Sequence, residues 1–207
     1  VQNWYSLELD SRITKKTKLI FEISERQIHD FYFLIGESPH KIQKIFFDVN
    51  FKKKHNSFLS YAVGFRCILT NGNSDYFSHN FYDERSRVYG DVSFRRNISN
   101  NTSISLRTRF QKQTENNFNF NQELINKLRE KIKLEYDINF IDTEIFLSLE
   151  FFYILYDSLE KLRYVLGFEK SLGKKTSINF SYMIQKEFNS DGSDLLMAFR
   201  TKLSYSF

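Results

Sequence analysis

Two groups of side chains in this sequence could do chemistry: a few histidines in polar stretches, and many charged residues at alternate positions. A hydrolase needs a nucleophile and a base, usually His, at one place. Ser78, His79 and Asp83 could form such a set because they lie close together in the chain. This combination is common in solvated loops, and no G-x-S-x-G or H-x-x-E-H motif occurs. We therefore predict no enzyme.

The other histidines do not indicate a metal site. His29 and His40 lie in or beside expected loops, and His55 follows the three lysines of residues 52–54. No cluster of His, Cys or carboxylate residues has the spacing of metal ligands. The single Cys67 cannot form an internal disulfide. The sequence thus predicts no metal, no cofactor and no catalytic residue.

The charged residues form the larger group, and many recur with a period of two. That spacing places side chains on one face of an extended strand. Both signs of charge are present, so that opposite charges on neighbouring strands can pair. We predict a charge network made by Arg66, Arg87, Arg95, Arg107, Arg109, Arg129, Lys131, Glu135, Glu150, Arg163, Glu169 and Arg200.

The elements that must position these charges are β-strands. From Leu195 to Phe207 the odd positions are mostly apolar and the even positions mostly polar, and residues 145–155 and 59–69 alternate in the same way. Eleven such segments are predicted, at residues 4–13, 18–28, 43–52, 59–69, 85–97, 103–114, 126–138, 145–155, 161–170, 178–185 and 195–207.

The composition agrees with strands that have one apolar face. The 207 residues include 23 Phe and 12 Tyr, yet nearly every aromatic residue is flanked by polar ones. No apolar run approaches the ~18–20 residues of a transmembrane helix. One Pro and seven Gly leave no room for a flexible linker. We predict a single domain over residues 1–207.

The expected connections alternate in length. Short polar turns are predicted at residues 14–17, 52–56, 99–102, 139–142 and 173–176, and longer loops at 33–41, 71–84, 115–123, 156–160 and 189–194. Short periplasmic turns opposite longer extracellular loops are typical of outer-membrane barrels. Lipid does not tolerate unpaired backbone groups, so the strands must close on themselves. The predicted fold is all-β, a closed antiparallel transmembrane β-barrel of about 10–12 strands.

Two expectations concern the ends of the barrel. Eleven strands would put Val1 and Phe207 on opposite sides of the membrane, whereas bacterial barrels normally have an even count. An upstream strand could be missing, the first segment could lie outside the barrel, or two strands could be merged between Phe21 and Ile35. Aromatic girdles at the membrane interfaces are predicted from Trp4, Tyr5, Phe81, Tyr82, Phe118, Phe120, Tyr156 and Phe188.

Several segments are similar to a known family. They are the opening WYSLELDSRITKKTKLIFEIS, the central ERSRVYGDVSF and SLRTRFQ, the strand LREKIKLEYDI and the closing LRYVLGFEKSLGKKTSINFSYMI. Together they resemble the Bacteroidota barrel family catalogued as domain of unknown function 2490. The resemblance covers most of the chain. It implies an outer-membrane barrel of about 10–12 strands with no assigned activity, and it transfers no catalytic residue.

These observations predict a protein of the Gram-negative outer membrane, in contact with outer-membrane lipid. With 30 basic and 25 acidic residues, no nucleic-acid partner is expected. The favoured role is structural, or the binding of an envelope protein partner, with a lumen filled by paired charges. The alternatives are a narrow pore that weakly favours anions, a lipid-modifying enzyme with its site at the rim, and a soluble lipocalin-like binder with its apolar face inward. The oligomeric state stays open.

Overall fold

The described part of the chain forms eleven β-strands, the number predicted. The computed structural model describes residues 1–28, 42–71, 81–116, 122–156, 158–188 and 195–207. The strands are β1 (Gln2–Thr14), β2 (Thr17–Ile28), β3 (Ile42–Lys54), β4 (Leu59–Asn71), β5 (Phe81–Asn97), β6 (Thr102–Asn116), β7 (Gln122–Ile138), β8 (Thr143–Ile154), β9 (Leu159–Ser171), β10 (Thr176–Glu187) and β11 (Leu195–Ser206). A short 3₁₀ helix, η2 (Asn139–Ile141), joins β7 to β8. Over the described ranges, no helix is long and apolar enough to span a membrane.

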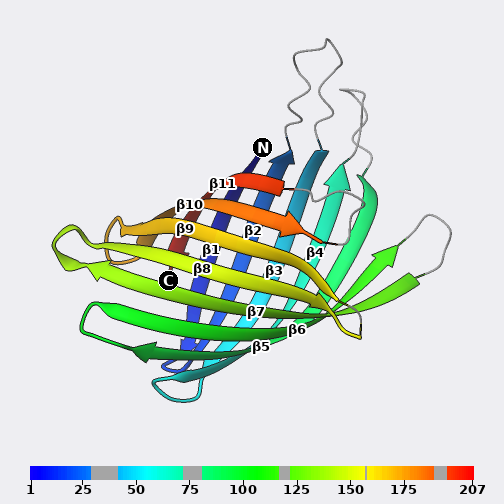
Figure 1. Cartoon of the computed structure of the whole chain (residues 1–207). Helices are drawn as coiled ribbons and strands as arrows, with labels where there is room; N and C mark the ends of the chain where they lie inside the picture. The colour runs from blue at the N-terminus through cyan, green and yellow to red at the C-terminus, as the bar shows by residue number, and fades with distance from the viewer. Residues whose placement is uncertain (29–41, 72–80, 117–121, 157, 189–194) are drawn as a thin grey trace, which may run out of the picture.

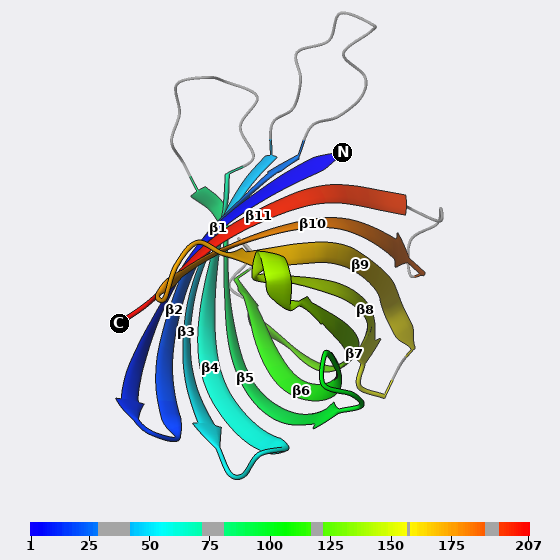
Figure 2. The same ribbon diagram turned by 90° about the vertical axis from the view of Figure 1, so that its left-hand side faces the viewer.

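The sheet closes into a barrel in which the strands follow one another in chain order (Figures 1 and 2). Consecutive strands pair antiparallel. The closing pair, β1 with β11, is parallel, and Leu7 lies opposite Leu203. An odd number of strands makes the first and last run in the same direction, so this pair has to be parallel. The predicted count of eleven is confirmed for the closed barrel, and β1 belongs to it. Residues 17–28 form one strand, whereas the rest of the segment considered for two merged strands, residues 29–35, lies outside the described part.

A cysteine pair tests the parallel closure. In a Cys67→Ser background, Leu7→Cys with Leu203→Cys should form a disulfide on mild oxidation, because paired residues lie within reach of one another. The disulfide joins the first strand to the last. The crosslinked protein should therefore migrate differently from the reduced protein in a denaturing gel, and reductant should remove the difference. The pair Leu7→Cys and Leu195→Cys lies out of register. Equal crosslinking of this second pair would contradict the register between β1 and β11.

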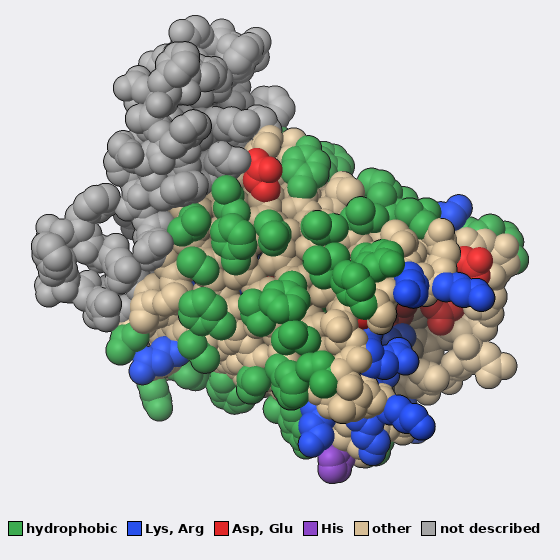
Figure 3. Space-filling model, turned by 180° about the vertical axis from the view of Figure 1, so that it is seen from behind, with side chains coloured by type: hydrophobic (Ala, Val, Ile, Leu, Met, Phe, Trp, Pro, Cys, Tyr) green, Lys and Arg blue, Asp and Glu red, His purple; other side chains and the backbone are tan. Residues whose placement is uncertain are grey.

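The outer face of the barrel is apolar. Among its exposed side chains are Val63 at 61%, Leu166 at 56% and Phe199 at 57% exposure. Figure 3 shows hydrophobic side chains spread over the middle of one face, with Lys and Arg gathered towards one end. An apolar surface of this extent suits contact with lipid rather than water. The fold is a transmembrane β-barrel, and the lipocalin-like alternative, which requires the apolar face inside, is wrong.

The two ends of the barrel differ. Five short turns, after β1, β3, β5, β7 and β9, lie at one end, where the Phe207 amide donates to the Asp10 carbonyl at 2.9 Å. Gln2 pairs with Ile28 at the opposite end. At that end, residues 155–158 alone join β8 to β9, so the longer loop predicted at 156–160 is as short as a turn. Tyr156 adopts a left-handed conformation there, with φ of 70°.

Part of the lumen is filled by an apolar cluster, which consists of Trp4, Phe146, Val165, Met183 and Ala198. The girdle prediction for Trp4 is therefore wrong: its side chain is 6% exposed and shares the inward face of β1 with Gln2. Tyr5, one residue on, faces outward and is exposed. Of the other predicted girdle residues, Tyr156 and Phe188 are exposed, whereas Phe118, Phe120 and the side chains of Phe81 and Tyr82 lie outside the described part.

Gly167 allows the apolar cluster to pack against β9. A Cβ at this position would lie 2.5 Å from the Ser181 Cβ, and 2.6 Å from both the Phe146 ring and the Phe180 carbonyl oxygen. Gly167→Ala should therefore lower the free energy of unfolding by about 1 to 3 kcal/mol, because a crowded core must shift. Urea unfolding in lipid vesicles measures this. Gly90→Ala is the matched control, since its Cβ would meet nothing closer than 4.0 Å. Equal losses in the two variants would contradict the packing argument.

Candidate functional site in the barrel lumen

A cavity of about 590 Å³ lies inside the barrel, lined by residues of all eleven strands. Its lining contains fourteen Lys and Arg side chains and six Asp and Glu side chains. Alternation puts these residues inside, because every second side chain of a strand faces the lumen. The excess of eight cations gives the cavity a positive potential that low-dielectric walls strengthen.

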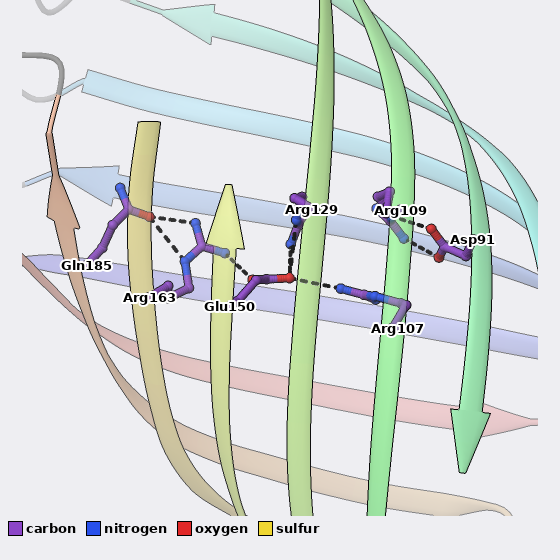
Figure 4. Close-up of polar contacts among 7 residues, drawn as sticks. All are labelled: Asp91, Arg107, Arg109, Arg129, Glu150, Arg163 and Gln185. Atoms are coloured by element: carbon purple, nitrogen blue, oxygen red, sulfur yellow. Dashed lines mark hydrogen bonds and ion pairs between the residues drawn. The ribbon is translucent and has the colours of Figure 1, made fainter. Parts of the chain in front are cut away.

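Glu150 on β8 is the centre of the largest network in the lumen (Figure 4). Its Oε1 accepts from Arg129 at 2.6 Å and from Arg107 at 3.0 Å, and its Oε2 accepts from Arg163 at 3.2 Å. Arg163 also donates to the Gln185 side-chain oxygen at 2.6 Å. The Glu150 side chain is only 4% exposed. One buried carboxylate therefore compensates the charges of three guanidinium groups.

A second network lies on the wall formed by β3 to β6. Arg109 donates both Nε and a terminal nitrogen to Asp91, at 2.6 and 2.7 Å, and its guanidinium carbon lies 3.7 Å from the centre of the Tyr89 ring. The Tyr89 hydroxyl donates to Asp48 at 2.6 Å. Arg66 donates to the other oxygen of Asp48 at 2.6 Å. Two carboxylates on this wall therefore each form an ion pair with one arginine.

A smaller cavity of about 300 Å³ lies towards the turns. Here Glu135 accepts from Arg95 at 2.9 Å and is also bonded to Lys133. Lys133 bonds Glu144 at 3.0 Å as well. Arg107 and Lys131 line both this cavity and the larger one. These two cations therefore stand where the two cavities meet.

The charge pairs follow the wall of the barrel. Asp48 and Arg66 lie on adjacent strands, and Glu150 reaches Arg107 only two strands away, from β8 to β6. Lys202 bonds Glu8 across the β1 and β11 closure. Because these contacts join near neighbours, they brace the wall and leave the cavity unbridged at these positions.

The structure places the predicted charge network in three locations. Glu169 stands apart, accepting from Ser177 at 2.8 Å and Asn179 at 3.4 Å. Arg95 and Glu135 pair near the turns. The other nine line the larger cavity: Arg66, Arg87, Arg107, Arg109, Arg129, Lys131, Glu150, Arg163 and Arg200.

Several residues beyond the twelve predicted ones belong to the same networks. Asp48 and Asp91 stand on the inward register of their strands and hold an arginine each. Gln185 has the same inward register on β10. Tyr89 lies opposite Gly64 in the β4 and β5 pairing, where a Cβ on residue 64 would overlap the Tyr89 ring. A glycine opposite an aromatic residue was the available signal for this last position.

The loop set considered for hydrolysis lies outside the described residues. This holds for Ser78 and His79 and for the side chain of Asp83, and also for His29 and His40. His55 is exposed, and its ring lies edge-on to Tyr61. Within the described strands and turns, no three His, Cys, Asp or Glu residues form a group that could hold a metal ion.

Comparison with known proteins gives a family and a distant structural similarity. No curated protein matches this sequence. Among solved structures, an anion-selective porin from Comamonas acidovorans superimposes with a TM-score of 0.40 at 12% sequence identity. The match covers 90% of this chain and 55% of the porin chain, so that this chain spans about half the porin's length. Residues 1–196 match the family described as "Protein of unknown function (DUF2490)", and the chain therefore belongs to the DUF2490 family.

Proposed function

We propose that this protein is an outer-membrane channel for small solutes that favours anions. The observation that carries the proposal is the position of Arg107 and Lys131, which line both lumen cavities. Because the two cavities share lining residues, we infer that they are two parts of one path through the barrel. A solute that moves along this path passes both cations.

The charge of the lining supports a preference for anions. The larger cavity has fourteen basic and six acidic side chains, and the cavity near the turns has six basic side chains and one acidic, Glu135. Rings of Arg and Lys favour anions in pores. A cation would meet an unfavourable potential in both cavities.

The surface of the barrel supports an outer-membrane location. An apolar outer face, short turns at one end and a closed sheet are what a bacterial outer-membrane protein requires. Arg and Lys at the turn end suit the headgroup region. The proposal therefore places the channel in the outer membrane of a Gram-negative bacterium.

Planar-bilayer recording of the refolded protein tests the proposal. Across a KCl gradient, single-channel steps should appear, and the reversal potential should have the sign of chloride permeation. The reversal potential should decline as salt rises, because screening shortens the reach of the lumen charges. A reversal potential that follows potassium would contradict the proposal.

A second candidate is a scaffold that conducts nothing and binds an envelope protein. Two observations favour it: the apolar cluster around Met183 fills part of the lumen, and Glu150 ties three arginines together. The same recording separates the two functions. A barrel that shifts in gel mobility on heating, inserts in lipid and carries no current would be the scaffold.

A further inference from the structure

Two buried aromatic rings in the lumen hold arginine side chains against their faces. The guanidinium carbon of Arg26 lies 3.6 Å from the centre of the Trp4 ring and 4.2 Å from that of Phe46. Arg200 lies 4.8 Å from the Trp4 ring centre. We refer to Trp4, Phe46, Arg26 and Arg200 as the stacked-arginine site. Both arginines line the larger cavity, and both lie over the Trp4 ring.

The rings are fixed in position. Trp4 is 6% exposed and Phe46 is 3% exposed. The Trp4 indole donates its Nε1 hydrogen to the Gln2 side-chain oxygen at 2.8 Å, which sets the orientation of the ring. Arginines stacked on fixed rings lose little freedom when they bind a ligand. The site is therefore organised before any ligand arrives.

No carboxylate lies within salt-bridge distance of the two cations of this site in the described residues, although Glu22 and Glu150 line the same cavity and attract Arg200 at longer range. Among the described residues, neither Arg26 nor Arg200 forms an ion pair, whereas the neighbouring Arg163 and Arg66 bond Glu150 and Asp48. Arg163 lies 5.5 Å from the Trp4 ring, and Arg66 lies 5.8 Å from the Phe46 ring, which adds positive charge nearby. A cation removed from bulk water without a partner is costly. An anion from solution would remove that cost.

We propose that Arg26 and Arg200 bind an oxyanion with at least two charged oxygens, for which inorganic phosphate is the test ligand. A guanidinium whose face is covered by a ring keeps its in-plane N–H donors for a ligand. These donors match the spacing of two oxygens on one carboxylate or phosphate, and a halide ion cannot accept them in that way. The inference rests on the proposed channel function and names the class of solute that the lumen selects.

Phosphate block of the chloride current tests this site. In the wild-type channel, phosphate should reduce the current saturably at constant ionic strength. Arg26→Gln should weaken this block at least about tenfold, because one charge-assisted bidentate contact is lost. Lys127→Gln is the control, since it removes a positive charge from the same cavity but at a lysine already bonded to Glu160 at 2.8 Å. In Lys127→Gln, the phosphate concentration that blocks half of the current should change by no more than about threefold.

A second measurement keeps the site and the channel function separable. Phosphate should raise the unfolding temperature of the detergent-solubilised barrel more than sodium chloride of equal ionic strength does, and Arg26→Gln should abolish the difference. If the protein carries no current but shows this Arg26-dependent shift, the site stands and the channel function fails. If chloride passes while phosphate neither blocks nor stabilises, the site is overturned and the channel function stands. Equal effects of Arg26→Gln and Lys127→Gln would also overturn the site.

Discussion

Replacing Glu150 by Gln should lower the free energy of unfolding of the barrel by about 3 to 5 kcal/mol, the loss expected when one partner of a buried ion pair is removed. Glu150 accepts from Arg107, Arg129 and Arg163, and its side chain is 4% exposed. The amide keeps the size and one acceptor oxygen but loses the charge. Three guanidinium groups would then face one another without compensation.

Urea unfolding in lipid vesicles measures the effect of Glu150→Gln. The matched control is Glu169→Gln, which also neutralises an inward carboxylate. Glu169 accepts from the neutral side chains of Ser177 and Asn179 and compensates no arginine of the described strands, so this change should cost about 1.5 to 3 kcal/mol, the range for a hydrogen bond to a charged group. A loss for Glu150→Gln no larger than that of Glu169→Gln would show that water or bound anions, rather than Glu150, compensate the arginines.

Lys131→Glu should lower the preference of the channel for chloride over potassium by about tenfold, which corresponds to about 1.4 kcal/mol. Lys131 lines both lumen cavities, so an ion that follows the proposed path passes close to it. The substitution changes the local charge by two units in a region of reduced dielectric constant, where charges act strongly on one another. The reversal potential in a KCl gradient should move towards that of potassium.

Arg96→Glu controls for the change in total charge. Arg96 is exposed and lies in a groove with Phe94, Leu106 and Ile132, on the outward face near the turns. The same two-unit change there should leave the reversal potential within a few millivolts of the wild-type value, because about 10 Å of salt solution screens an exposed charge. If Arg96→Glu and Lys131→Glu act equally, net charge rather than the lumen path determines selectivity.

The strands could be predicted because alternation is a local property of an extended chain. The segment predicted at residues 59–69 is β4, Leu59–Asn71, and the one at 103–114 is β6, Thr102–Asn116. Each side chain's face follows from its parity in the strand, so the inward position of Glu150 and Arg163 could also be predicted. Chain order then defines most strand pairs, because neighbouring hairpins pair with one another.

The contacts within the lumen could not be predicted, because they depend on the stagger between strands. Glu150 lies opposite Lys131 and Arg163 in the registers of its two neighbours, yet it bonds Arg107 on β6. Long arginine side chains reach past the adjacent strand, and sequence alone gives no distance across a curved wall. Trp4 was misassigned for a related reason: its place near a strand end suggested the interface, while its parity put it in the lumen.

The parallel seam between β1 and β11 dictates the order in which the barrel can be completed. Every other pairing joins strands that are consecutive in the chain and closes a short loop, whereas the seam joins residues 2–10 to residues 198–206. Before β11 arrives, β1 and β10 both present an unpaired edge. A chain that ends before Leu195 therefore forms an open sheet whose unpaired edges can associate with other strands. Because lipid does not tolerate such edges, insertion into the hydrocarbon requires the last strand.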